Sequence, residues 1–325
     1  MDELERPEIK QFNDLLKALS DPCEERVYHY TSASGLRGII ENHEIWLTNT
    51  EFVNDISECK TLHEQKTFFD EYFSEVSNKD VIDSWENFKR QPHIFNNYYI
   101  ASFSKKRNSL EQYRAYGSFC ICFETDKFVK RGFSQFECIY DISKIGEWIV
   151  DKSRVPEWDL NCFEAQYKRS AAEALIFAAS VKCKNNHYKA EEEVRLFTVS
   201  NHQYNRKGLL KYSNDFYRWV NEPSIYFREH IAFATPVPYV KFIIPDKAME
   251  VGEKNGAGEE TLVQMKERKL KEEKDYRRQR LPIKEVQIGP MLHQKEAKVA
   301  VEILLCEKGY EDTLVTISDI PYRGF

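Results

Sequence analysis

The sequence predicts an α+β fold, in which a β-sheet carries helical insertions and ends in a β-α-β unit. Short runs of β-branched and aromatic residues, typical of strands, alternate with polar turns along most of the chain. Segments with helical apolar spacing interrupt these runs at 60–95 and 161–180. The chain then closes with a strand at 285–288, a helix at 294–308 and a strand at 313–318. A crossover of this length joins parallel strands, so we expect this unit to complete the same sheet.

The composition is that of a folded globular protein. With 325 residues, 42% of them hydrophobic and 14% aromatic, the chain is expected to bury a full core in one large or two medium domains. The formal net charge of −6 gives no global basic field. Tight nonspecific nucleic-acid binding is therefore not expected from charge alone, although a local groove is compatible with it.

The cysteines and the apolar segments indicate in which cellular compartment the protein is expected. Eight cysteines are scattered, and none pair at the spacing of a zinc knuckle, which indicates buried free thiols in a reducing cytosol. The N-terminal residues lack the apolar core of a signal peptide, and no apolar run approaches the roughly 20 residues that span a bilayer. We therefore predict a cytoplasmic protein with no metal and no membrane partner.

The predicted segments are an N-terminal helix at 1–23, a core at 24–250 with its helical insertion at 60–95, an insert at 251–281, and the β-α-β unit at 282–325. Charged residues dominate 259–280, so this part is expected to be a solvated helix or disordered rather than part of the core. Its basic end points to an acidic partner, and we expect a partner protein to bind there.

The stretch 27–58 carries the first candidate site. Residues 27–31 predict a strand that places His29 between two tyrosines. A serine follows that is expected to cap a short helix, and then come a strand at 45–48 and a polar turn at 54–58. A strand histidine, a helix packed back on it and a polar loop together form a ligand cleft. The alternative is a histidine whose hydrogen bonds are satisfied within the core.

The second candidate segment surrounds two tyrosines. We predict a strand at 98–104, a polar turn at 105–108, a helix at 109–116 ended by Gly117, and a strand at 119–124. Tyr113 and Tyr116 lie one helical turn apart and present one aromatic face. Core packing is the alternative explanation of this face.

The third candidate segment, 188–197, predicts a strand that begins with three consecutive glutamates. On a strand, Glu191, Glu193 and Arg195 point to the same side. Either a solvated edge or a cleft that needs two carboxylates and a guanidinium explains this pattern. Around the segment we predict a strand at 134–142, a helix-rich region at 214–231 and a strand at 238–245.

The order of these motifs resembles the prokaryotic domain-of-unknown-function 2971 family. The matching pieces are YHYTSASGLRGII, FVNDISE, FSKKRNSLEQYRAYG, YKAEEEVRLF, VQIGP and ISDIPYR, which together extend from the first candidate site to the end of the chain. The chain departs from the family at Gln112-Tyr113, where a Met-Trp pair is expected, and in its charged insert.

The front half is also similar to the ADP-ribosyltransferase superfamily. The cleft of that superfamily begins with a strand bearing His or Arg, followed by a helix, and ends with a strand bearing a glutamate, often as Glu-x-Glu. Tyr28-His29-Tyr30-Thr31 matches the first motif and Glu191-x-Glu193 the last. The resemblance implies an ADP-ribosyltransferase-like split sheet, mixed or antiparallel, with NAD as a substrate.

The same resemblance implies roles for individual residues. Breaking the nicotinamide–ribose bond passes through an oxocarbenium-like centre, which Glu193 would stabilise while binding a ribose hydroxyl. Glu191 would orient or deprotonate the acceptor, and His29 would hydrogen-bond the adenosine-side ribose. Tyr113 or Tyr116 would stack on nicotinamide. The other implied cofactor-binding residues are Tyr30, Thr31, Asn54, Ser104 and Arg195. The last of these would either pair with the glutamates or reach the pyrophosphate.

Three classes of function follow from these patterns. The first is ADP-ribosyl transfer from NAD to a nucleic acid or protein, in bacterial or phage defence or as a toxin effector, with NAD hydrolysis as a variant. The second is a metal-independent nuclease in which His29, Tyr30 and the 105–107 turn handle phosphate. The third is a non-catalytic binding module. The first class predicts that His29 and Glu193 lie on neighbouring central strands and face one pocket.

Overall fold

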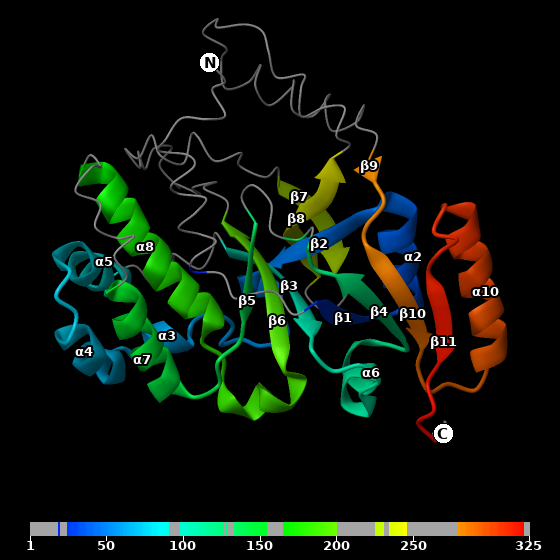
Figure 1. The fold of residues 1–325 in the computed structure, drawn as a ribbon, viewed down its shortest axis with the longest axis horizontal. Coiled ribbons are helices and arrows are strands. Elements are labelled where there is room, and N and C mark those ends of the chain that lie inside the picture. The colour runs from blue at the N-terminus through cyan, green and yellow to red at the C-terminus, as the bar shows by residue number, and fades with distance from the viewer. Residues whose placement is uncertain are drawn as a thin grey trace, which may run out of the picture.

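The computed structural model describes residues 19, 25–90, 98–126, 128, 133–154, 165–199, 225–230, 234–245 and 278–321 (Figure 1). This part of the chain is an α+β fold built on one mixed sheet, as the sequence predicts. The predicted N-terminal helix lies outside the described residues except for Leu19, and so do residues 251–277 of the charged insert with their expected partner contact.

The described strands form a single sheet. They are β1 (Arg26–Thr31), β2 (Glu44–Asn49), β3 (Tyr98–Ser104), β4 (Phe119–Glu124), β5 (Ser134–Glu137), β6 (Glu193–Val199), β7 (Ile225–His230), β8 (Thr235–Pro245), β9 (Arg278–Gln279), β10 (Ile283–Ile288) and β11 (Leu314–Ile317). The main order is β11-β10-β4-β1-β3-β2-β8-β7, with β6 beside β3, β5 beside β6, and β9 beside β8. Strands β10 and β11 pair in parallel, and the other described pairs are antiparallel.

Helices cover both faces of this sheet. They are α2 (Ala33–Asn42), α3 (Thr61–Glu64), α4 (Lys66–Ser74), α5 (Lys79–Lys89), α6 (Leu110–Tyr116), α7 (Ile142–Ser153), α8 (Ala165–Lys182) and α10 (Gln294–Glu307), with short 3-10 turns η2 (Thr50–Phe52) and η5 (Asn186–Glu191). One core joins α3, α4, α5, α7 and α8 to strands β3, β5 and β6. A second core joins α2 and α10 to β1, β3, β4, β8 and β10. Tyr98 and Ile100 belong to the first core and Tyr99 and Ala101 to the second, so the two cores lie on opposite faces of β3.

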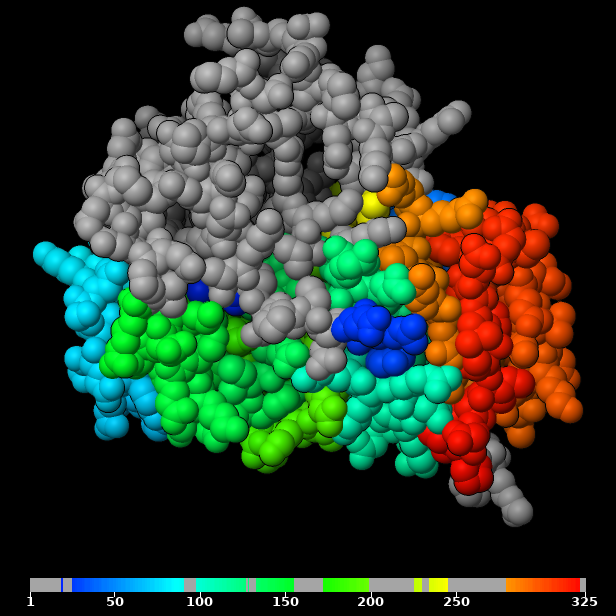
Figure 2. All heavy atoms as spheres, in the orientation of Figure 1, coloured from blue at the N-terminus to red at the C-terminus, as the bar shows by residue number. Residues whose placement is uncertain are grey.

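The C-terminal prediction is confirmed. Helix α10 crosses between the parallel strands β10 and β11, and both strands belong to the main sheet. In Figure 2 this unit, coloured orange and red, lies at the opposite end of the molecule from α4 and α5, coloured cyan. No helix in the described ranges is long and apolar enough to cross a membrane.

Several local predictions are wrong. The insertion at 60–95 was expected to be a helical pair over the sheet, but its described residues 60–90 form three helices, α3 to α5. Within the predicted helix-rich region 214–231, residues 225–230 form the strand β7. The predicted strand at 188–197 begins only at Glu193, because Asn186–Glu191 form a 3-10 turn and Glu192 takes a left-handed conformation (φ 44°). Glu191 and Glu193 are therefore not alternate residues of one strand.

A gap in the sheet positions the candidate site. Strand β6 pairs with β3 along its whole length, from Tyr98 to Ser104. The other edge of β3 is shared, because β2 pairs with it only at Tyr99 and Ile100, and β1 only at Ser104. Among the described strands none pairs with residues 101–103 on that edge. Strands β1 and β2, which α2 connects, therefore diverge along the middle of β3.

Candidate functional site

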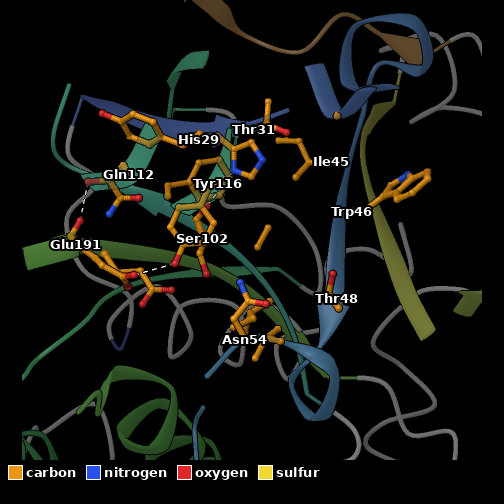
Figure 3. A pocket seen from close by; sticks show the side chains of 18 of the residues that line it. His29, Thr31, Ile45, Trp46, Thr48, Asn54, Ser102, Gln112, Tyr116 and Glu191 are labelled. Atoms are coloured by element: carbon orange, nitrogen blue, oxygen red, sulfur yellow. Dashed lines mark hydrogen bonds between the residues drawn. The ribbon is translucent and has the colours of Figure 1, made fainter. Parts of the chain in front are cut away.

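A pocket of about 750 Å³ opens where β1 and β2 diverge (Figure 3). Its walls come from β1, the start of α2, β2, the 52–58 loop, the unpaired edge of β3, helix α6, and the segment 184–193. Arg228 of β7 also lines it. A pocket of this size accommodates a ligand as large as a nucleotide or a drug-sized molecule.

His29 spans the gap between β1 and β3. Its Nδ1 lies 3.0 Å from the carbonyl oxygen of Ser102, and its ring contacts that of Phe103. Because a carbonyl accepts, Nδ1 carries the proton, and Nε2 of the neutral ring is left as an acceptor. Burial lowers the pKa of His29, and the hydrogen bond to Ser102 offsets this only in part. The imidazole is therefore neutral at physiological pH.

Glu193 lines the pocket and is buried, with 3% exposure. Its Oε2 accepts hydrogen bonds from Lys184 Nζ and, at 3.2 Å, from Arg195 NH2. Its Oε1 is buried as well and accepts no hydrogen bond from the described residues. An unsatisfied buried carboxylate oxygen costs free energy, so a donor entering the pocket gains by binding it.

Arg195 lies behind Glu193 and not in the pocket. Its guanidinium is fully buried and donates to Glu58 Oε1, Glu193 Oε2 and the carbonyl oxygen of Val181. Arg195 is not among the lining residues, so the structure supports its predicted pairing with glutamates and not its contact with a pyrophosphate.

Glu58, Lys184, Glu193 and Arg195 form one buried ion cluster, here called the Glu193 cluster. Burial alone would raise the pKa of Glu193, but the charges and hydrogen bonds of Arg195 and Lys184 lower it to about 2. Burial raises the pKa of Glu58, and the charges of Arg195 and Lys184 offset this effect of burial only in part. Glu193 is thus ionised at neutral pH.

Glu191 reaches the same pocket from the end of η5. Its Oε2 pairs with Lys184 Nζ at 2.9 Å, and its Oε1 accepts from the Tyr116 hydroxyl at 2.8 Å. Tyr116 also lines the pocket and is 40% exposed. Glu191 and Glu193 therefore both pair with Lys184, although they do not share a strand face. With Glu58 they place three carboxylates against the cations of Lys184 and Arg195.

Tyr113 lies outside the pocket lining, so of the two predicted stacking residues only Tyr116 is available to a ligand. The Tyr113 ring packs edge-on against Tyr30, and its hydroxyl donates to Gln287 Oε1 at 3.0 Å. A Cβ at Gly289 would come within 2.5 Å of the Tyr113 ring, which explains a glycine at that position. The helical spacing of the two tyrosines did not reveal which of them faces the core.

Tyr30 and Ser104 line the pocket, but both use their hydroxyls to fix the 105–109 turn and η5. The Tyr30 hydroxyl donates to Lys106 O at 2.7 Å and accepts from Ser109 N at 2.9 Å. Ser104 Oγ donates to Glu191 O at 2.6 Å and accepts from Lys106 N at 3.0 Å. These two residues position the site and have no free donor for a ligand.

Thr31 and Asn54 complete the predicted set. Both line the pocket, Thr31 from the end of β1 and Asn54 from the loop after η2. Thr31 is packed against Gly117, where a Cβ would come within 2.6 Å of the Thr31 carbonyl (φ +126° at the glycine). Asn54 is exposed and is the more accessible of the two.

His29 and Glu193 face one pocket, as expected, but they do not lie on neighbouring strands. Strand β3 separates β1 from β6, and the pairings of Tyr28 with Ser104 and of Ser104 with Glu193 place Tyr28, not His29, on the Glu193 face. In a continuous sheet His29 would face the other way. The divergence of β1 from β3 lets its ring enter the gap instead.

The basic turn required by the nuclease hypothesis lies outside the pocket lining. Lys105 pairs with Glu137, Lys106 with Glu192, and Arg107 with Glu285. The described cysteines are free thiols, and Cys306 is exposed rather than buried. The described residues include no group of three His, Cys, Asp or Glu placed to hold a metal ion.

Sequence reasoning missed Glu58, Lys184 and Arg228 as residues of the site. Glu58 ends the polar FVNDISE cluster, which was expected to turn the chain but not to pair with Arg195, 137 residues away. Lys184 follows the long helix α8 in a segment without a functional pattern. Arg228 lies in the region predicted to be helical.

Comparisons with protein-family models, with curated proteins and with solved structures find no match for this chain.

Proposed function

We propose that this protein cleaves NAD and transfers ADP-ribose to a macromolecular acceptor, a nucleic acid or a protein, within an ADP-ribosyltransferase-like split sheet. The observation that carries the proposal is the carboxylate of Glu193, because this residue lines the pocket and its buried Oε1 has no donor among the described residues. A ribose presents hydroxyl donors, and the neutral His29 adds a second acceptor at Nε2 in the same pocket. Two acceptors in one pocket suit a ligand rich in hydroxyl groups.

Glu193 is suited to stabilise positive charge on the ribose. When the bond between ribose C1′ and the nicotinamide nitrogen breaks, its electron pair leaves with nicotinamide and C1′ becomes cationic. The carboxylate is ionised, buried and held in place by Lys184 and Arg195, so it needs no rearrangement when that charge develops. The three carboxylates around the two cations leave this wall of the pocket with excess negative charge.

Glu191 and Tyr116 supply the remaining steps. The Tyr116 ring, oriented by its hydroxyl bond to Glu191, offers a face for the nicotinamide ring. The acceptor then attacks C1′ and gives its proton to the Glu191 carboxylate, while the Tyr116 hydroxyl keeps its own proton. Glu191 is 20% exposed, against 2% for Glu193, so a large acceptor reaches the former more easily.

Nicotinamide release from NAD by the pure full-length chain tests this proposal. Glu193→Gln keeps the shape of the side chain but removes its charge, so turnover should fall by about 10²–10³ while NAD affinity, measured by calorimetry, changes little. Glu192→Gln is the matched control, because Glu192 is exposed and pairs with Lys106 outside the pocket lining. Equal small losses in the two variants, or no nicotinamide release by the unmodified protein, would overturn the proposal.

A further inference from the structure

The pocket contains a second polar feature besides the ion pairs around Glu193. Arg228 of β7 lines it, and its NH2 donates to Thr48 Oγ1 at 2.9 Å. Its Nε is buried and has no hydrogen-bond partner in the described part of the chain. No described carboxylate forms an ion pair with it. A partly buried guanidinium without a carboxylate is costly, and burial lowers the pKa of Arg228.

The surroundings of Arg228 hold its guanidinium in one orientation. The guanidinium carbon lies 5.5 Å from the centre of the Trp46 ring. This ring packs against Tyr239 with 4.4 Å between centroids and the two planes tilted by 32°. Trp46, Thr48 and Tyr239 belong to one face of the paired strands β2 and β8. In Figure 3, Trp46 lies on one side of the pocket, and Tyr116 and Glu191 lie on the other.

The Glu44 carboxylate, which belongs to the same face of β2 as Trp46 and Thr48, is already engaged. Glu44 is buried, accepts a hydrogen bond from Trp46 Nε1 at 2.7 Å, and pairs with Lys241 at 3.3 Å. Its charge is therefore compensated without Arg228. This leaves the guanidinium as a positive group in a pocket whose opposite wall is negative.

We propose that Arg228, oriented by Thr48 and Trp46, forms a subsite for a phosphate group. A planar guanidinium with unused N–H donors matches phosphate oxygens in charge and geometry. The phosphate comes either from the pyrophosphate of NAD or from the backbone of a nucleic-acid acceptor. The subsite rests on the proposed function, since Arg228 and Glu193 line the same pocket. Ligand binding tests the subsite without requiring NAD cleavage, so the subsite and the proposed function can fail separately.

Calorimetric titration of the full chain with NAD, and separately with a short single-stranded oligodeoxynucleotide, tests the subsite. Arg228→Gln should weaken the binding of one of these ligands about tenfold or more, because a charge-assisted hydrogen bond is lost. Arg90→Gln is the control, because Arg90 is 74% exposed and pairs with Glu86 on α5, away from the pocket. If Arg228→Gln fails to fold, Thr48→Val, which removes the hydroxyl that orients the guanidinium, should weaken the same ligand about threefold.

The two ligands distinguish the two phosphate sources. Loss of NAD affinity alone assigns the subsite to the pyrophosphate. Loss of oligonucleotide affinity, with a weaker dependence on salt concentration, assigns it to the acceptor. Oligonucleotide binding by a protein that neither binds nor cleaves NAD would remove the proposed function and leave the subsite. Unchanged affinity for both ligands in folded Arg228→Gln would overturn the subsite.

Discussion

The two glutamates of the Glu-x-Glu motif lie in contrasting surroundings. Glu193 belongs to a buried cluster whose partners come from the loop after β2, the end of α8 and β6 itself. Glu191 lies at the more accessible rim, which we define as His29, Tyr116 and Glu191. One short motif therefore supplies a buried carboxylate that is held by ion pairs, Glu193, and a more exposed one, Glu191. The fixed charge is inseparable from the stability of the fold, whereas the rim can change with less structural cost.

The largest expected effect is the loss of stability when Arg195 is removed from the Glu193 cluster. Arg195 is fully buried, and Arg195→Met leaves Glu58 and Glu193 without their shared guanidinium. Removing one partner of a buried ion pair costs about 3–5 kcal/mol, because the remaining charge is uncompensated. We expect that loss in the free energy of unfolding measured by urea denaturation.

Arg37→Met provides the comparison for this measurement. Arg37 is 68% exposed and pairs with Glu41 on the surface of α2, where such pairs contribute less than about 1 kcal/mol. Similar unfolding free energies for the two variants would show that the Glu193 cluster contributes no more to stability than a surface pair. The distinction between the buried cluster and the rim would then be lost.

A smaller effect is expected for Glu191→Gln, which should slow transfer to the acceptor and not the release of nicotinamide. Glu191→Gln retains the bond from the Tyr116 hydroxyl but cannot take a proton from the acceptor. General-base catalysis contributes about 10²-fold at the low end of its range, so transfer to the acceptor should fall by that factor. Nicotinamide release with water as acceptor should change less than threefold. Product analysis by mass spectrometry distinguishes transfer from hydrolysis, and an equal loss in both reactions would assign Glu191 the same role as Glu193.

The sequence predicted the individual helices and strands of the site better than the contacts between them. The strand with His29, the capped helix after it and the parallel C-terminal unit follow from local periodicity and turn residues, and each is present. The N-cap of α2 is Ser32, whose side chain accepts from Gly35 N. These features depend on residues close in sequence, which is why pattern reasoning finds them.

The remaining features of the site depend on contacts between distant segments. The alternation rule placed Glu191 and Glu193 on one strand face, but the strand begins only at Glu193, after the left-handed Glu192. They meet instead through Lys184, which no local pattern marks. The gap between β1 and β3 is likewise set by which strands share an edge, and this depends on the topology of the whole sheet.

The smallest expected effect concerns His29 at the rim. His29→Ala removes one neutral hydrogen bond that is made in the ground state and the transition state alike, so the KM for NAD should rise about tenfold while kcat stays nearly unchanged. His29→Gln keeps an acceptor and should recover part of that affinity. A fall in kcat with unchanged KM would instead place His29 in the chemical step.

The pH dependence gives His29 a second, independent test. Because burial lowers its pKa below the usual 6.5, the folded protein resists protonation of this ring, and the neutral form persists to a lower pH than in the unfolded chain. The stability linked to His29 is therefore present above pH 6.5 and declines as the pH falls below that value. In the unmodified protein, the KM for NAD should be constant above neutral pH and rise once the ring is protonated in acid, because Nε2 then ceases to accept. His29→Gln has no titrating group at this position, so its KM should lack this acid-side rise, and a rise of the same size in that variant would assign the effect to another group.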